Sequence, residues 1–345
     1  MLRSGMTDEG LIVWQEDVDC PSSASHMLGT FSREKAELQY KGEFLMNGIL
    51  IMNKPDGFTS HDVVAKLRGI LHTRKIGHGG TLDPMATGVL PVFLGGATKA
   101  ADYAAAQDKE YVAGFQLGLA TDTQDTTGVT LQTADKRISE AELRAVLADF
   151  VGAVQQIPPM YSAVKVGGKK LVDLARKGVE IERPSREIFV RELELLEFDE
   201  QTQSGRLRTV VSKGTYVRTL IHDFGAAAGT LAAMSSLVRT RSGRYGLDKA
   251  YDFAAVEQAM AEERIDDLLL PTDSLFLDYP AVTLKKEGYD RQINGAPMFE
   301  RQTSGFPQEK GALCRVYYQD EFLMLGRVDE LDVGGLALFV HKRFL

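Results

Sequence analysis

The most informative stretch of this chain is Gly77-His78-Gly79-Gly80-Thr81-Leu82-Asp83-Pro84-Met85-Ala86-Thr87-Gly88. Its four glycines lack side chains, so a ligand or another segment of the chain can come close to the backbone. Pro84 favours an extended backbone at Asp83 and removes the next amide donor. A carboxylate on such a stiff turn suits a reactive group. The alternative is an ordinary turn between two elements, because Asp-Pro and Gly-Gly pairs are common in turns.

Composition restricts the class of protein. The chain has 345 residues, 44% hydrophobic and 26% charged, which is typical of a soluble globular protein with about two domains. No run of about 18 apolar residues occurs, so we expect no membrane span. Cys20 and Cys314 are the only cysteines, and they indicate neither a disulfide framework nor a metal cluster. The two distant cysteines fit a reducing cytosol, so we expect a cytoplasmic location. The six histidines lack metal-ligand spacing, so we expect no metal.

The charge distribution does not indicate a nucleic-acid enzyme. The formal net charge is −8, and half of it lies in residues 1–45, which hold four Lys/Arg and eight Asp/Glu. The remaining 36 Lys/Arg and 40 Asp/Glu also give −4. RNA binding would therefore depend on local basic patches. The segment with Lys165, Lys169, Lys170, Arg176 and Lys177 is one such patch, although a solvated helix face explains each of these residues equally well.

Hydrophobic periodicity predicts a mixture of strands and helices. Alternating apolar residues over 111–117 are typical of a strand with one buried face. Thr59 and Ser139 each precede an acidic residue three positions later, which predicts a helix N-terminus at each of them. Strands are expected at 49–52, 111–117, 188–198 and 206–211, and helices at 59–72, 97–107, 139–150, 169–177, 215–228 and 252–261. Short β runs at 312–318, 322–328 and 336–340 predict a small barrel.

The glycine-rich stretch, continued through Val89-Leu90-Pro91, resembles the signature of the TruB-type tRNA pseudouridine synthases. Five further segments agree with this family in order and spacing. They are Gly48-Ile49-Leu50-Ile51-Met52-Asn53-Lys54-Pro55, Thr59-Ser60-His61-Asp62-Val63-Val64, Lys109-Glu110-Tyr111, Pro158-Pro159-Met160-Tyr161-Ser162-Ala163-Val164-Lys165 and Lys213-Gly214-Thr215-Tyr216-Val217-Arg218. The resemblance runs from about residue 46 to the C-terminus. Gly79 departs from the pattern, since some members of the family have threonine there.

The resemblance implies an α/β (α+β) fold of the pseudouridine synthase type, with a mixed, largely antiparallel sheet flanked by helices. A small C-terminal PUA-like β domain is expected behind it. We therefore expect a catalytic domain at 46–280 and a PUA-like RNA-binding domain at 281–345. Residues 1–45 match nothing in the family and lack sustained periodicity, so we interpret them as an extension from a mis-set start, with a regulatory tail as the alternative.

The same resemblance assigns catalytic roles. Asp83 falls on the catalytic aspartate of the family. Arg218 is expected to pair with Asp83 and keep it ionised, because a nearby cation favours the charged form of a carboxyl. Tyr111 is expected to stack on a flipped base and to move a proton at C5. Without the family pattern, a helix-surface arginine and a core tyrosine would be the simpler interpretations.

Four further residues are expected to bind the substrate. By resemblance, His78 enters the RNA loop and fills the space left by the flipped base. The alternatives are a general base, since an unperturbed histidine has a pKa of about 6.5, and a histidine that only hydrogen-bonds its own loop. Tyr216 forms a pocket wall or simply packs. Lys54 supports the pocket or contacts phosphate, with a solvated lysine as the alternative. Lys165 contacts the tRNA backbone.

The expected activity is isomerisation of uridine-55 in the T loop of tRNA to pseudouridine. This reaction oxidises nothing and imports no group, so we expect no cofactor. The expected partner is the T arm of tRNA, with no protein partner required. Two alternatives stay open: a guide-RNA-dependent relative of the family, and a tRNA-binding folding helper whose catalysis is dispensable.

Overall fold

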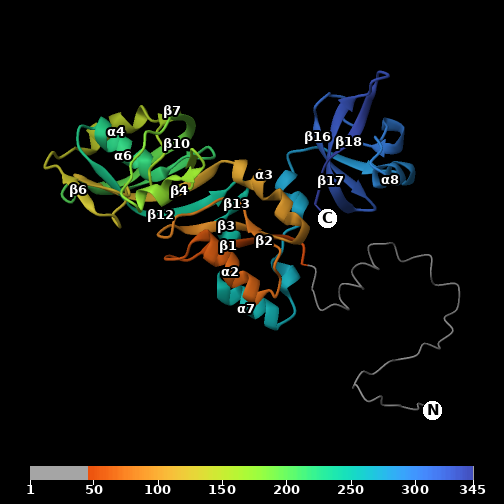
Figure 1. The fold of residues 1–345 in the computed structure, drawn as a ribbon, viewed down its shortest axis with the longest axis horizontal. Coiled ribbons are helices and arrows are strands. Elements are labelled where there is room, and N and C mark those ends of the chain that lie inside the picture. The colour runs from red at the N-terminus through yellow and green to blue at the C-terminus, as the bar shows by residue number, and fades with distance from the viewer. Residues whose placement is uncertain (1–45, 345) are drawn as a thin grey trace, which may run out of the picture. The chain divides into compact units, whose positions relative to one another are not determined.

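The computed structural model describes residues 46–344. The interpretation of residues 1–45 as a non-conforming extension lies outside the described residues. Two separate sheets organise the described chain (Figure 1). No helix in this range is long and apolar enough to cross a membrane.

The larger sheet is mixed and largely antiparallel. Seven of its strands lie in the order β1 (Gly48–Lys54), β3 (Thr87–Leu94), β12 (Ala232–Ser242), β4 (Lys109–Leu117), β11 (Ser204–Val211), β10 (Arg186–Asp199) and β7 (Gly152–Gln156). Two short strands extend it, since β2 (Ile76–His78) pairs with β3 and β13 (Tyr245–Gly246) pairs with β12. The β12–β3 pair is parallel, whereas the other pairs along this order are antiparallel. The predicted fold class is thereby confirmed.

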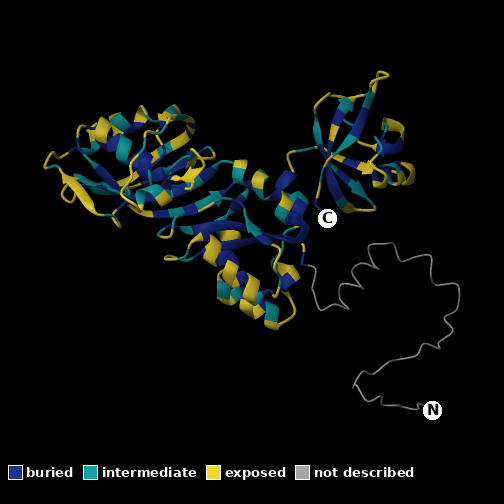
Figure 2. Cartoon of the chain, viewed as in Figure 1, coloured by how far each residue is buried: buried dark blue, intermediate teal, exposed yellow. Residues whose placement is uncertain are grey.

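Helices cover the two halves of this sheet. Helices α2 (Ser60–Ile70) and α7 (Phe253–Ala261) bury apolar residues against β1 and β3. Helices α4 (Glu140–Ala148) and α6 (Val217–Ala227) do the same against β4, β10 and β11. Figure 2 shows the resulting pattern, with dark, buried strands and helices that are exposed on their outer faces.

The helix starts follow from local sequence. Thr59 and Ser139 accept hydrogen bonds from the backbone of Asp62 and Glu142, whose carboxylates bond back to the cap residues. These two capping boxes satisfy amide groups that the first turn of a helix leaves unpaired. The predicted N-termini of α2 and α4 are therefore confirmed.

Three local predictions need correction. The segment predicted as one helix over 97–107 is a 3-10 turn, η1 (Gly95–Ala100), followed by α3 (Ala101–Ala106). The helix predicted over 169–177 begins only at α5 (Leu171–Ala175), because β9 (Lys169–Lys170) pairs with β8 (Lys165–Val166). Strand β12 was not predicted, since serines and arginines interrupt its apolar alternation.

A second, smaller sheet lies near the C-terminus. Its five strands have the order β15 (Thr303–Ser304), β14 (Ala281–Leu284), β16 (Leu313–Tyr318), β17 (Glu321–Glu330) and β18 (Leu336–Arg343). The helix α8 (Lys286–Ile293) contacts β14, and a separate apolar cluster fills this region. A small C-terminal β unit is thereby confirmed. Its PUA-like character and the boundary at residue 280 stay predictions.

Candidate active site

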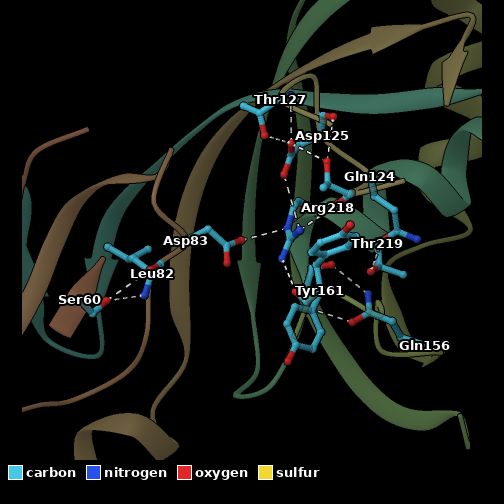
Figure 3. Close-up of polar contacts among 12 residues, drawn as sticks. Ser60, Leu82, Asp83, Gln124, Asp125, Thr127, Gln156, Tyr161, Arg218 and Thr219 are labelled. Carbon is cyan, nitrogen blue, oxygen red and sulfur yellow. Dashed lines mark hydrogen bonds and ion pairs between the residues drawn. The ribbon is translucent and has the colours of Figure 1, made fainter. Parts of the chain in front are cut away.

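The glycine-rich stretch comprises the end of β2, a loop over residues 79–86 (the Asp83 loop) and the start of β3, and side chains from other elements hold the loop backbone. Ser60, the first residue of α2, accepts a hydrogen bond from the Leu82 amide at 2.8 Å (Figure 3). Lys54, the last residue of β1, donates to the carbonyl of Pro84 at 3.0 Å. Asp83 is therefore flanked on both sides by fixed residues, although four glycines lie in the stretch around it.

The buried side chain of Lys54 supports the backbone of the loop. Its side chain is 0% exposed, and its ammonium also donates to the carbonyls of Pro55 and Phe58. Burial lowers the pKa of Lys54 from 10.5 to about 8, with the nearby Asp56 carboxylate opposing the shift. Of the two roles expected for Lys54, support of the pocket matches this geometry, because the ammonium is occupied by backbone carbonyls.

Asp83 and Arg218 form an ion pair. Arg218 lies in the first turn of α6 and is 5% exposed, and its Nε is 2.9 Å from Asp83 Oδ2 (Figure 3). On the opposite side, Arg218 Nη1 is 3.5 Å from Asp125 Oδ2. The guanidinium also donates to the carbonyls of Thr123 at 2.8 Å and Tyr161 at 3.1 Å. Arg218 thus joins three loops that are far apart in sequence.

The Asp83 carboxyl is partly exposed, with 33% of its side chain accessible to solvent. Its surroundings nevertheless desolvate it. Burial raises the pKa of Asp83 above its ordinary value of 3.8. The Arg218 guanidinium lowers this pKa, and the Asp125 carboxylate raises it. Arg218 therefore acts in the expected direction, but burial outweighs it. Asp83 is a carboxyl with one accessible side and one fixed cation.

A cavity of about 860 Å³ opens over this ion pair. Its size is typical of sites that hold small ligands or single nucleotides. Its walls combine the Asp83 loop, the start of α6 and the segment around Tyr161. Its lining residues include Gly80, Asp83, Lys109, Tyr111, Tyr161, Arg176, Tyr216, Arg218 and Arg239.

The two predicted tyrosines both line the cavity. Tyr111 lies on β4 beside β12 and β11, and its side chain is largely buried. Tyr216 directly precedes α6, where its amide donates to Gln156 Oε1 at 2.8 Å and its carbonyl accepts from Gln156 Nε2 at 3.1 Å. The Arg186 guanidinium lies 5.0 Å from the Tyr216 ring centroid. Tyr216 is therefore held as a wall of the cavity.

The structure does not bring His78 and Lys165 into this cavity. His78 lies on β2, and its buried Nδ1 has no hydrogen-bond partner among the described residues. Burial lowers the pKa of His78, so the neutral imidazole is favoured. Lys165 is exposed on the β8–β9 hairpin. There it lines a second hollow with Lys169, Lys170 and Lys177.

Three polar residues around the site were missed from sequence. Asp125 lies in the polar loop over residues 121–128. Lys109 was quoted only as part of a motif, yet it is buried and lines the cavity. Arg239 lies on the unpredicted strand β12. For Lys109 and Arg239 the signal is a charged residue beside an apolar run, and for Asp125 it is one carboxylate in a polar loop; sequence alone does not distinguish either from a surface charge. The described residues contain no cluster of side chains suited to a metal ion.

Comparisons with known proteins agree with this geometry. Residues 68–217 match the N-terminal domain of the TruB family of pseudouridylate synthases, and residues 218–277 match a tRNA pseudouridylate synthase B C-terminal domain. The second match ends before β14, so it does not include the small sheet.

Similar proteins span most of the chain. It is 44% identical to tRNA pseudouridine synthase B of Geobacillus thermodenitrificans, over 75% of this chain and 89% of that protein. It is 39% identical to the protein of the same name from Lactiplantibacillus plantarum, over 81% and 94%. Among solved structures, a Cbf5-Nop10-Gar1 complex matches with a TM-score of 0.68 and 29% identity, covering 87% of this chain and 86% of that one. The chain belongs to the TruB family of pseudouridylate synthases and is an isomerase.

Proposed function

We propose that this protein converts uridine-55 in the T loop of tRNA to pseudouridine, with Asp83 as the group that acts at C1′ of the target nucleotide. The observation that carries the proposal is the Asp83–Arg218 ion pair, 2.9 Å between Nε and Oδ2, under an open cavity. The relatives at 44% and 39% identity are both named tRNA pseudouridine synthase B, which supports tRNA as the substrate.

The chemistry requires little beyond a carboxylate and a proton carrier. The bond between C1′ and N1 breaks, the base turns, and C1′ joins C5. N1 gains a proton, and C5 loses one. The Asp83 carboxylate either attacks C1′ as a nucleophile or assists elimination there, and both routes need its ionised form. No electron is transferred to or from the substrate, so we expect no cofactor.

The cavity supports roles for the remaining residues. The target base must leave its stack, at a cost of a few kcal/mol. Tyr111 lines the cavity, which supports its proposed roles in stacking on the flipped base and carrying the C5 proton, and Tyr216 forms a wall. His78 fills the space in the RNA loop. Lys165 and its neighbouring lysines contact the tRNA backbone, because exposed cations suit phosphates.

The small sheet serves as a second RNA-binding unit. We assign residues 281–345 to a PUA-like RNA-binding domain and residues 46–280 to the catalytic domain. The enzyme acts in the cytoplasm on the T arm of tRNA, without a protein partner. A guide-dependent enzyme is the weaker alternative, since the relatives at 44% and 39% identity are named tRNA pseudouridine synthase B.

The test is incubation of the protein with unmodified tRNA in the absence of guide RNA, followed by mapping of pseudouridine. We expect one pseudouridine per tRNA, at position 55, and none in a control tRNA with cytidine at that position. A folded, tRNA-binding protein that makes no pseudouridine without a guide would overturn the proposal. Equal refolding of a misfolded tRNA by wild type and Asp83→Asn, with no modification by either, would instead identify a folding helper.

A further inference from the structure

Arg239 is buried in the centre of the larger sheet. Its side chain is 1% exposed, the largest of the fully buried side chains in the described chain. In the strand register, it lies opposite Gly88 of β3 on one side and opposite Tyr111 of β4 on the other. The strand β12, which carries Arg239, lies between β3, which follows the Asp83 loop, and β4, which carries Tyr111 (Figure 1).

The Arg239 guanidinium donates hydrogen bonds to backbone carbonyls on both sides of Asp83. Its Nε donates to the carbonyl of Val89 at 2.6 Å, just after the loop. Its two terminal nitrogens donate to the carbonyls of Gly80 at 3.2 Å and Thr81 at 3.4 Å, just before Asp83. One side chain thus links the segments on both sides of the loop.

The backbones of Arg239 and Gly88 lie too close together for Gly88 to be replaced by a residue with a side chain. Gly88 has a φ of +100°, and a Cβ there would lie 2.3 Å from the carbonyl oxygen of Arg239. The exit of the loop is therefore tied to Arg239 through the backbone as well as through the guanidinium. A shift of Arg239 would move the loop and the strand β4 relative to each other.

The charge of Arg239 has no acidic partner in the part of the chain that the structure describes. Each described ion pair involves other residues, and the guanidinium contacts backbone carbonyls instead. A buried cation without a carboxylate costs free energy. The planar fork of arginine reaches several carbonyls at once, which the single ammonium of lysine does not.

We propose that Arg239 is a positioning residue that sets the Asp83 carboxylate relative to the Tyr111 ring. This inference rests on the proposed function and deepens it. Displacement of a reacting group by about 1 Å costs about 100-fold in rate, so a loosened loop damages chemistry before it damages binding.

The test compares Arg239→Lys with Arg241→Lys, a matched control on the same strand. Arg241 is 38% exposed and contacts Glu110 at 3.5 Å. We would measure the single-turnover rate at saturating unmodified tRNA, the Kd for tRNA, and amide hydrogen exchange over residues 79–82 in the free protein. For Arg239→Lys we expect a rate about 10- to 100-fold lower, a Kd within about threefold of wild type, and faster exchange. For Arg241→Lys all three should stay within about twofold of wild type.

A folded Arg239→Lys protein with an unchanged rate would overturn the proposal, as would a weakened Kd with an unchanged rate at saturation. Arg239→Gln, whose amide keeps a planar donor, covers the case in which the lysine variant melts below the assay temperature. If both variants melt there, Arg239 is a folding residue and the proposal fails. If wild type makes no pseudouridine, the proposed function fails, while hydrogen exchange still shows whether Arg239 holds the loop.

Discussion

The Asp83 loop, residues 79–86, and the basic hairpin, residues 165–177, use their charges in opposite ways. In the loop, buried cations and a buried hydroxyl hold the backbone on both sides of Asp83. In the hairpin, four lysines are exposed around a hollow. The hairpin is held instead through its backbone, with Leu171 donating to the Val164 carbonyl at 2.8 Å.

This difference separates two tasks. Bond making at C1′ needs a carboxylate fixed within a fraction of an ångström. Contact with a flexible, negatively charged backbone needs accessible cations, and their effect is screened by salt. The loop should therefore control the rate at saturating tRNA, and the hairpin should control affinity.

Asp83→Asn should have the largest effect. The substitution keeps the shape of the side chain and removes the charge, so pseudouridine formation should fall by about 10⁴-fold or more. The Kd for tRNA should change by less than about threefold, because one carboxyl contributes little to phosphate binding. Single-turnover conversion and filter binding measure the two quantities. Substantial turnover by Asp83→Asn would refute its assignment as the catalytic residue.

Arg218→Ala should come next, with a loss of about 100- to 1,000-fold in the single-turnover rate. Asp83 would lose its cation, and the carbonyls of Thr123 and Tyr161 would lose a donor. Because the two residues act as a unit, adding Arg218→Ala to Asp83→Asn should lower the rate little further. Arg218→Lys is the control that keeps the charge. Additive losses in the double variant would refute the functional pairing.

The pH dependence tests the burial of Asp83. Burial raises its pKa above 3.8, so the single-turnover rate should fall as pH decreases through the raised value. The folded state then binds the proton more tightly than the unfolded state, and the free energy of unfolding falls as pH rises through this window. The Asp83→Asn protein has no carboxyl at this position, so it lacks this pH-dependent contribution to the free energy of unfolding. Its Tm relative to wild type should therefore be higher at about pH 7 than at about pH 3. A Tm difference that shrinks with rising pH would contradict the raised pKa.

Substitutions in the basic hairpin should have the smallest effect on chemistry. Replacing Lys165, Lys169, Lys170 and Lys177 by glutamine should weaken tRNA binding several-fold. Each lost phosphate contact should reduce the salt slope of log K by about 0.7 to 0.9. The rate at saturating tRNA should stay within about twofold of wild type. The matched control replaces four exposed lysines outside the hairpin, and an equal loss of affinity there would mean that the hairpin is not a specific contact.

The sequence predicted most where the physical signal is local. The capping boxes at Thr59 and Ser139 and the alternation over 111–117 each depend on a few adjacent residues. The resemblance to the family identified Asp83 and Arg218 as a pair, and in the structure their side chains lie 2.9 Å apart. Their roles in catalysis stay predictions.

The unpredicted features depend on contacts between distant segments. Strand β12 lies in the middle of the sheet although Ser235, Ser236 and two arginines break its pattern. From sequence alone, Arg239 is interpreted as a surface residue, because the loop carbonyls that it contacts are 158 and 159 residues away in the sequence. Likewise, the sequence predicts that the lysines of β9 begin a helix, because their pairing with β8 is not visible in the local pattern.

The central claim is that the Asp83 loop carries the chemistry and the basic hairpin carries the affinity. Its most direct test is the single-turnover rate and the Kd, measured on one unmodified tRNA for wild type, Asp83→Asn and the four-lysine variant. The account predicts that Asp83→Asn binds tRNA normally and forms no pseudouridine, whereas the four-lysine variant binds weakly and reacts at the wild-type rate once saturated. Measurable conversion by fully bound Asp83→Asn, or a slow rate for the saturated four-lysine variant, would contradict it.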